Sequence, residues 1–101
     1  MRVLAPTLVF ALALSCSHAA EDGAKVAAKY NCLACHAVDH KIVGPAYKDI
    51  AKKYRGQKGI EAKLMAKIKQ GGAGVWGQIP MPAQQIGDQD LRTIVHWVLA
   101  Q

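Results

Sequence analysis

The sequence predicts one all-α domain of four to five short helices in residues 21–101. Apolar residues recur at intervals of three and four in the segments 47–54, 60–69 and 88–100, which is typical of helices with one buried face. Glycines and prolines separate these segments and end the helices. The remaining observation is the pentapeptide Cys32-Leu33-Ala34-Cys35-His36, around which we expect the helices to be arranged.

The C-x-x-C-H spacing of this pentapeptide is typical of covalent attachment of c-type haem. Two thiols three residues apart on one helical turn lie side by side, so each can form a thioether with one vinyl group of the haem. The next side chain points elsewhere on the turn and can reach the iron. We therefore predict one haem c, bound through Cys32 and Cys35, with His36 as an axial metal ligand.

A thioredoxin-like dithiol and a zinc site are the other interpretations of this motif. A redox dithiol is expected in a βαβ unit, whereas residues 22–31 before the motif are rich in alanine and lysine and predict a helix. A structural zinc site needs four nitrogen or sulfur ligands, and no second C-x-x-C or H-x-x-x-H follows. The haem interpretation agrees best with the sequence.

Residues 1–20 have the pattern of a secretory signal peptide. Arg2 supplies a positive charge, residues 3–14 form an apolar run, and residues 15–20 are small or polar. The run is shorter than the roughly 20 residues of a membrane-spanning helix. Cleavage is expected before Ala20, where Ser17 and Ala19 fit the small-x-small rule, or before Glu21. A lipoprotein signal at Cys16 is the alternative, although residues 13–15 fit it poorly.

Removal of the leader leaves Cys32 and Cys35, both of which the haem uses, so no disulfide is predicted. Export without a disulfide fits a bacterial periplasm. A domain of this size has a marginal core and usually needs an additional constraint. The haem would supply it, so we predict that the apo-protein is largely unfolded.

The chain is basic, and loss of Arg2 with the leader lowers its formal charge from +6 to +5. A basic surface steers a protein toward acidic partners. We expect redox proteins with acidic docking patches. Nucleic acid is not expected, because aromatic residues are few and no recognition motif is present. We also expect a monomer without a membrane anchor.

The first helix is expected over 22–31, with Asp22 as its N-cap. Gly44-Pro45 then makes residues 37–46 irregular. A ligating histidine needs an acceptor for its second ring nitrogen, and a backbone carbonyl in this loop, stiffened by Pro45, can supply it. His40 is too close to His36 in the chain to reach the other face of the iron and is expected at the surface.

The next two helices are expected at 47–54 and 60–69. Their apolar stripes are Tyr47, Ile50, Ala51 and Tyr54 in the first, and Ile60, Leu64 and Ile68 in the second.

The segment 70–87 has no helical period and contains Pro80-Met81-Pro82. An iron–thioether bond is weak, and two prolines stiffen the loop around the methionine. Methionine opposite histidine raises the reduction potential of cytochromes c, so Met81 is the predicted second axial ligand. Gln84 is a candidate donor to the Met81 sulfur, and the Trp76 indole N–H a candidate donor to a haem propionate.

The last helix is expected over 88–100, with Asp88 as its N-cap. Its apolar stripe should pack on the first helix near Val26 and Tyr30. The stripe is Leu91, Ile94, Val95, Val98 and Leu99. His96 lies off the stripe and is expected at the surface.

The stretches CLACH, VGPAYKDIA and GVWGQIPMP, in this order, resemble the small bacterial class I cytochromes c of the c-551/c-552 (c8) group. The resemblance covers residues 21–101. It implies the class I cytochrome c fold, axial ligation by His36 and Met81, a Pro45 carbonyl that holds His36, and contact of Trp76 with a propionate. Family members commonly begin with Glu-Asp, which favours cleavage before Glu21.

Two positions depart from the family. Ala27 stands where an aromatic residue often packs on the last helix, with Tyr30 as a partial substitute, and Asn31 stands where glycine is common.

The function implied is electron transport in the periplasm, not enzymatic catalysis. The resemblance suggests a respiratory cytochrome complex as donor, and a nitrite reductase or a terminal oxidase as acceptor. A haem c protein with an open sixth site for gas sensing or peroxidase activity is the alternative. It would require that Met81 not bind the iron. A structural subunit of a larger complex is a third interpretation.

Overall fold

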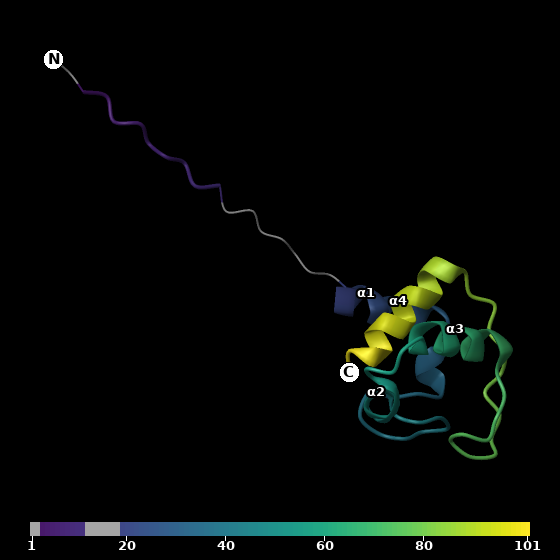
Figure 1. Ribbon diagram of the computed structural model, residues 1–101. Coiled ribbons are helices and arrows are strands. Elements are labelled where there is room, and N and C mark those ends of the chain that lie inside the picture. Colours follow the sequence, from purple (N-terminus) through teal and green to yellow (C-terminus); the bar gives the residue numbers. More distant parts are fainter. Residues whose placement is uncertain (1–2, 12–18) are drawn as a thin grey trace.

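The computed structural model describes residues 3–11 and 19–101 (Figure 1). Residues 3–11 are exposed and belong to no helix or strand, and Cys16 and Ser17 lie outside the described residues. The described residues contain no strand, and no helix among them has the length and hydrophobicity of a membrane-spanning segment. The all-α prediction is confirmed. The elements are α1 (Ala19–Lys29), the 3-10 turn η1 (Cys32–Ala34), α2 (Tyr47–Tyr54), α3 (Ile60–Gln70) and α4 (Asp88–Leu99).

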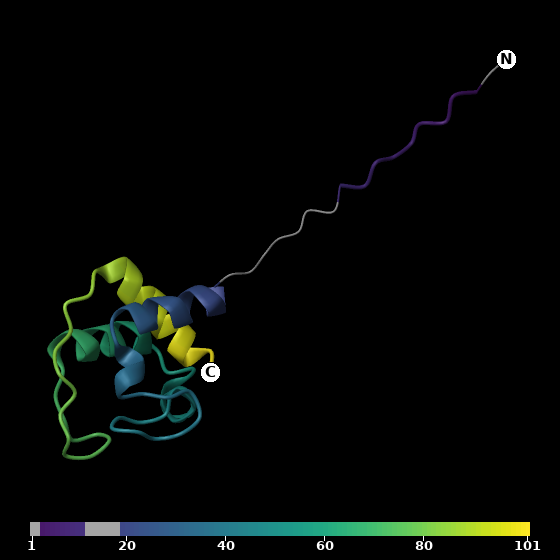
Figure 2. The same ribbon diagram turned by 180° about the vertical axis from the view of Figure 1, so that it is seen from behind.

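Helix α4 is the centre of the packing and contacts α1, α2 and α3 (Figures 1 and 2). Its predicted stripe is confirmed, because Leu91, Ile94, Val95 and Val98 are all buried, with Leu99 half-buried at the end. Trp97 is buried as well, although it is not part of the predicted stripe. Residues 71–87, which follow α3, run along the side of the domain that lies away from α1 (Figures 1 and 2).

Small residues allow α1 to approach α4 closely. Ala27 is fully buried at this contact. A Cβ added to Gly23 would lie 2.2 Å from the Trp97 Cβ. An aromatic residue of α4, Trp97, therefore packs directly against α1 at Gly23.

Gly23→Ala is expected to destabilise the protein by about 1–3 kcal/mol, because the methyl group has no room beside Trp97. Helix propensity alone predicts the opposite, a gain of about 1 kcal/mol. The reverse substitution at the exposed Ala28, Ala28→Gly, is the control and should cost about 1 kcal/mol. Denaturant unfolding of the haem-bound variants measures both, and a stabilised Gly23→Ala protein would contradict the close contact.

Tyr30 links the end of α1 to the first turn of α4. Its hydroxyl donates a hydrogen bond to Asp90 Oδ2 over 2.6 Å, and Lys29 Nζ lies 3.9 Å from the same oxygen. The hydrogen bond to the Asp90 carboxylate is the main cause that raises the pKa of Tyr30. Tyr30 lies two residues before Cys32, the first residue of the C-x-x-C-H motif.

Both predicted N-caps are wrong. Each aspartate was expected to lie just before the first helical residue, but both lie within their helices. Asp22 lies inside α1, which begins at Ala19, and Asp88 is the first residue of α4, after Gly87. An acidic residue in the first turn still interacts favourably with the helix dipole. The Asp88 carboxylate also pairs with Lys69 of α3, which lowers its pKa.

Candidate functional site

The C-x-x-C-H motif forms a tight turn directly after α1. Asn31 adopts the left-handed conformation, with φ of 60°, and residues 32–34 then form η1. The amide N–H groups of Cys35 and His36 both donate to the Cys32 carbonyl oxygen, at 3.2 and 3.0 Å. The turn therefore places both cysteines and His36 at one side of the domain.

Asn31→Ala is expected to destabilise the protein by about 1 kcal/mol, because alanine tolerates the left-handed region poorly. Asparagine and glycine adopt this conformation more readily, so Asn31→Gly should stay within about 0.5 kcal/mol of the wild type. Thermal unfolding of the two variants gives the comparison. Equal stability of both would show that the turn does not require a positive φ.

The two cysteines and His36 face a cavity of about 530 Å³. This is a typical volume for a cofactor or ligand site. Met81 lies on the wall of the same cavity, although 45 residues separate it from His36 in the chain. The rest of the wall is largely apolar and includes Ile50 of α2, Leu64 and Ile68 of α3, and Ile94, Val95 and Val98 of α4.

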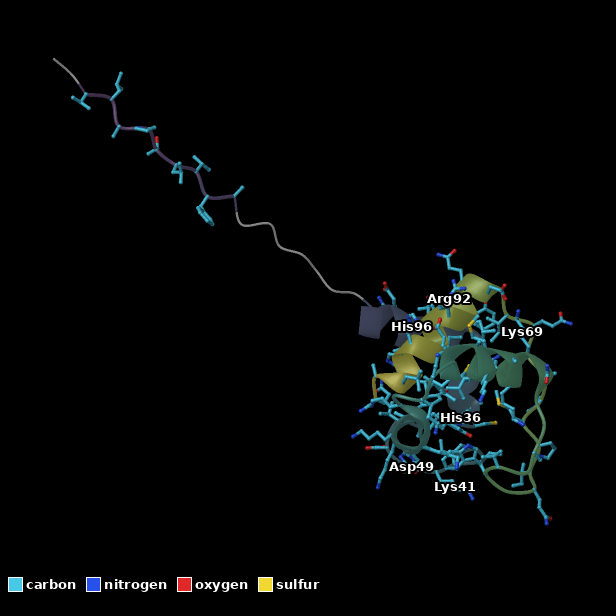
Figure 3. All side chains as sticks on the ribbon, viewed as in Figure 1. His36, Lys41, Asp49, Lys69, Arg92 and His96 are labelled. Atoms are coloured by element: carbon cyan, nitrogen blue, oxygen red, sulfur yellow. The ribbon has the colours of Figure 1, made fainter. Side chains whose placement is uncertain are left out.

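The loop 37–46 surrounds the His36 imidazole. His36 Nδ1 lies 2.7 Å from the Pro45 carbonyl oxygen, the contact that the family resemblance implied. A Cβ on Gly44 would lie 2.6 Å from His36 Cε1, so only glycine fits there without displacing the ring. Figure 3 shows His36 near the middle of the domain, with Lys41 and Asp49 near its lower edge.

The methionine loop is attached to the end of α3. Met81 and Gly72 exchange two backbone hydrogen bonds, each of 2.9 Å. Gly71 has φ of +68°, and a Cβ there would lie 2.4 Å from the Met81 carbonyl oxygen. The backbone N–H of Gln84 donates to the Ile68 carbonyl oxygen over 3.0 Å. Met81 is therefore held both by contacts with the end of α3 and by the two prolines that flank it.

Trp76 and Gln84 lie near the same loop. Trp76 lies on the cavity wall, is 39% exposed, and packs edge-on against Tyr54 with ring centroids 6.4 Å apart. The side-chain amide of Gln84 donates to the Pro82 carbonyl oxygen over 3.2 Å. The structure thus gives Gln84 a backbone partner in the methionine loop, and a hydrogen bond to the Met81 sulfur stays a prediction.

The other two described histidines are exposed, as expected. His40 Nδ1 lies 2.8 Å from its neighbour Asp39, and His96 Nε2 lies 2.8 Å from Glu61 on α3. In Figure 3, His96 and Arg92 lie along α4. Neither histidine lines the cavity.

Two residues of the site, Tyr47 and Gly44, were not predicted from the sequence. Tyr47 was assigned only to a helical stripe, yet its ring stacks on His36 with centroids 5.1 Å apart. Gly44 was treated only as a helix breaker. A glycine at a close backbone approach is a recognisable signal, whereas nothing local in the sequence indicates the stacking of Tyr47.

The donor set and the cavity fit a covalently bound haem. Neither cysteine of the described residues is in a disulfide, and both are half-buried at the cavity wall. Burial raises the pKa of the Cys32 thiol. The apolar wall suits a large flat macrocycle, and a histidine and a methionine are available to its iron. An all-α fold around such a site defines a c-type haem protein.

Comparisons with known proteins support this class. A model of the family Cytochrome c matches residues 20–101. Cytochrome c-551 of Pseudomonas aeruginosa is 51% identical over 82 residues, 81% of this chain and 79% of that relative. Cytochrome c-551 of Azotobacter vinelandii is 47% identical over 79 residues, 78% of this chain and 96% of that relative. The crystal structure of wild-type Nitrosomonas europaea cytochrome c552 superposes with a TM-score of 0.73 at 49% identity, covering 76% of this chain and 96% of that chain.

The chain belongs to the cytochrome c family and resembles its c-551/c-552 members. It is accordingly a monohaem electron-transfer protein rather than an enzyme, and its cofactor is one haem c, covalently bound through two thioethers.

Proposed function

We propose that residues 1–20 are removed on export and that residues 21–101 carry electrons in the periplasm between a respiratory donor and a terminal reductase or oxidase. A nitrite reductase is one such acceptor. Cys32 and Cys35 form the thioethers, and His36 and Met81 are the axial ligands. The haem iron supplies a reversible one-electron redox change.

One observation carries the proposal: the Cys32–His36 turn and Met81 line the same cavity. Each ligand has its own backbone support. The Pro45 carbonyl oxygen lies within hydrogen-bond distance of His36 Nδ1, and an N–H there fixes the ring and makes the imidazole a better electron donor. Gly72 and α3 hold the Met81 backbone before any bond to its sulfur is made. Filling both axial positions excludes substrates, which suits a carrier.

An absorption spectrum of the haem-bound protein, with and without carbon monoxide, tests this proposal. We expect a low-spin spectrum, a far-red sulfur-to-iron band in the oxidised form, and no response to carbon monoxide. A high-spin spectrum that shifts with carbon monoxide would instead support an open sixth site and a sensor or peroxidase function. Mass spectrometry of the periplasmic protein distinguishes a start at Ala20 from one at Glu21, and detects any lipid on Cys16.

We further propose that the cavity mouth is the docking face for an acidic partner and that the protein is a monomer. Lys41, Lys63 and Lys67 border the cavity, together with the exposed apolar side chains of Val75 and Ile79. Lysines at this place would steer an acidic protein so that the haem edge faces it.

The rate of electron transfer to an acidic partner should fall about tenfold or more as ionic strength rises from about 0.01 to 0.5 M, because salt screens the steering charges. Stopped-flow kinetics measures this. Lys63→Glu should lower the rate at low salt more than Lys48→Glu, since Lys48 is exposed on α2 but does not border the cavity. A rate that does not depend on salt would remove the role of the lysines.

A further inference from the structure

His36 packs against an aromatic ring and also lies within hydrogen-bonding distance of a backbone carbonyl oxygen. The Tyr47 ring stacks on the imidazole with ring centroids 5.1 Å apart and an angle of 19° between the planes. Tyr47 is only 4% exposed, so its ring has little freedom to move away. Gly44 lies close against the same imidazole.

The Tyr47 ring is in turn held by α4. Trp97 packs edge-on against it, with centroids 5.1 Å apart and an angle of 73°. Trp97 is 7% exposed and lies directly against Gly23 of α1. A continuous row of contacts therefore leads from Gly23 through Trp97 and Tyr47 to His36.

A hydrogen bond to the Pro45 carbonyl oxygen fixes the direction of one N–H bond of His36 but permits the ring to turn about that direction. A parallel ring against the imidazole face restricts this rotation. Orientation of a metal ligand by its surroundings tunes the metal, and polar groups usually supply it. Here the ring of Tyr47 is placed to orient the His36 imidazole.

We infer that Tyr47 is a positioning residue that holds the His36 imidazole in one rotational orientation, and that Trp97 acts through Tyr47. The packing of α4 on α1 thus sets the orientation of the axial ligand. This inference rests on the proposed ligation of the iron by His36.

The test compares haem-bound Tyr47→Leu, Tyr47→Phe and Tyr30→Leu with the wild type by NMR. The pattern of haem-methyl shifts in the oxidised form reports the orientation of the imidazole plane, and the exchange rate of the His36 Nδ1–H in the reduced form reports how well the ring is held. Tyr47→Leu should change the shift pattern and speed this exchange about tenfold. Tyr47→Phe keeps the ring and should match the wild type. Tyr30→Leu removes a tyrosine ring that does not line the cavity and whose hydroxyl bonds Asp90 instead, so both readouts should stay unchanged.

Unchanged readouts in Tyr47→Leu would overturn the inference. So would a Tyr47→Phe protein as altered as Tyr47→Leu, because the hydroxyl would then be responsible. If Tyr47→Leu does not fold, nuclear Overhauser contacts between the Tyr47 ring and the His36 imidazole in the wild type decide, since their absence excludes the stack. Failure of the proposed ligation by His36 would appear separately, as the absence of strongly shifted His36 imidazole resonances from the NMR spectrum of the oxidised wild type.

Discussion

Met81→Ala is expected to lower the reduction potential by about 0.2 V or more and to open the iron to carbon monoxide. Axial ligands set the potentials of haem proteins over a range of about 0.8 V, and a methionine thioether favours the reduced form. Alanine offers no sulfur, so the sixth position would be left to water or an external ligand. Potentiometric titration and a carbon monoxide difference spectrum measure the two effects, and the far-red band should disappear with them.

Met65→Ala is the matched control for this substitution. Met65 is half-buried on α3, packs against the core and does not line the haem cavity. Met65→Ala should leave the reduction potential and the far-red band unchanged. It should lower the free energy of unfolding by less than the roughly 2–5 kcal/mol that a fully buried methionine contributes. A Met81→Ala protein with the wild-type potential would rule out Met81 as the ligand.

Loss of the haem is expected to unfold most of the chain. Leu91 and Val95 are the largest fully buried side chains among the described residues, so helix-to-helix contacts alone make a thin core. Much of the apolar surface of α2, α3 and α4 faces the cavity instead. Without the macrocycle this surface is exposed to water, and a domain this small has little stability to lose.

Circular dichroism of the haem-free Cys32→Ala/Cys35→Ala double variant tests this expectation. Its helical signal should be weak and should melt without a cooperative transition. Adding free haem is the control, since His36 and Met81 are still present and should restore part of the helicity without the thioethers. A cooperatively melting, helical apo-protein would show that the helices form a sufficient core by themselves.

Features that depend on residues close together in the chain were predictable from the sequence. The C-x-x-C-H turn and the proline-flanked Met81 are local motifs, and the 3.6-residue period places α2 at the predicted residues 47–54. The ends of α1 and α4 were less accurate. Asp22 and Asp88 were assigned as caps because of residue type alone, but a helix end also depends on what the flanking residues contact, and the Asp88 side chain binds Lys69 of another helix.

The assembly of the cavity depends on contacts that form only in the folded chain. Gly71 and Gly72 hold the methionine loop against α3, and Gly23 lets Trp97 approach α1, where it packs edge-on against Tyr47. The contacts of Trp97 with Gly23 and Tyr47 join residues that are distant in the chain, and all of these contacts depend on volumes that must fit together in three dimensions. Local sequence motifs identify the chemical groups that the protein offers to a haem, whereas the packing of α4 against the other helices determines where those groups are held.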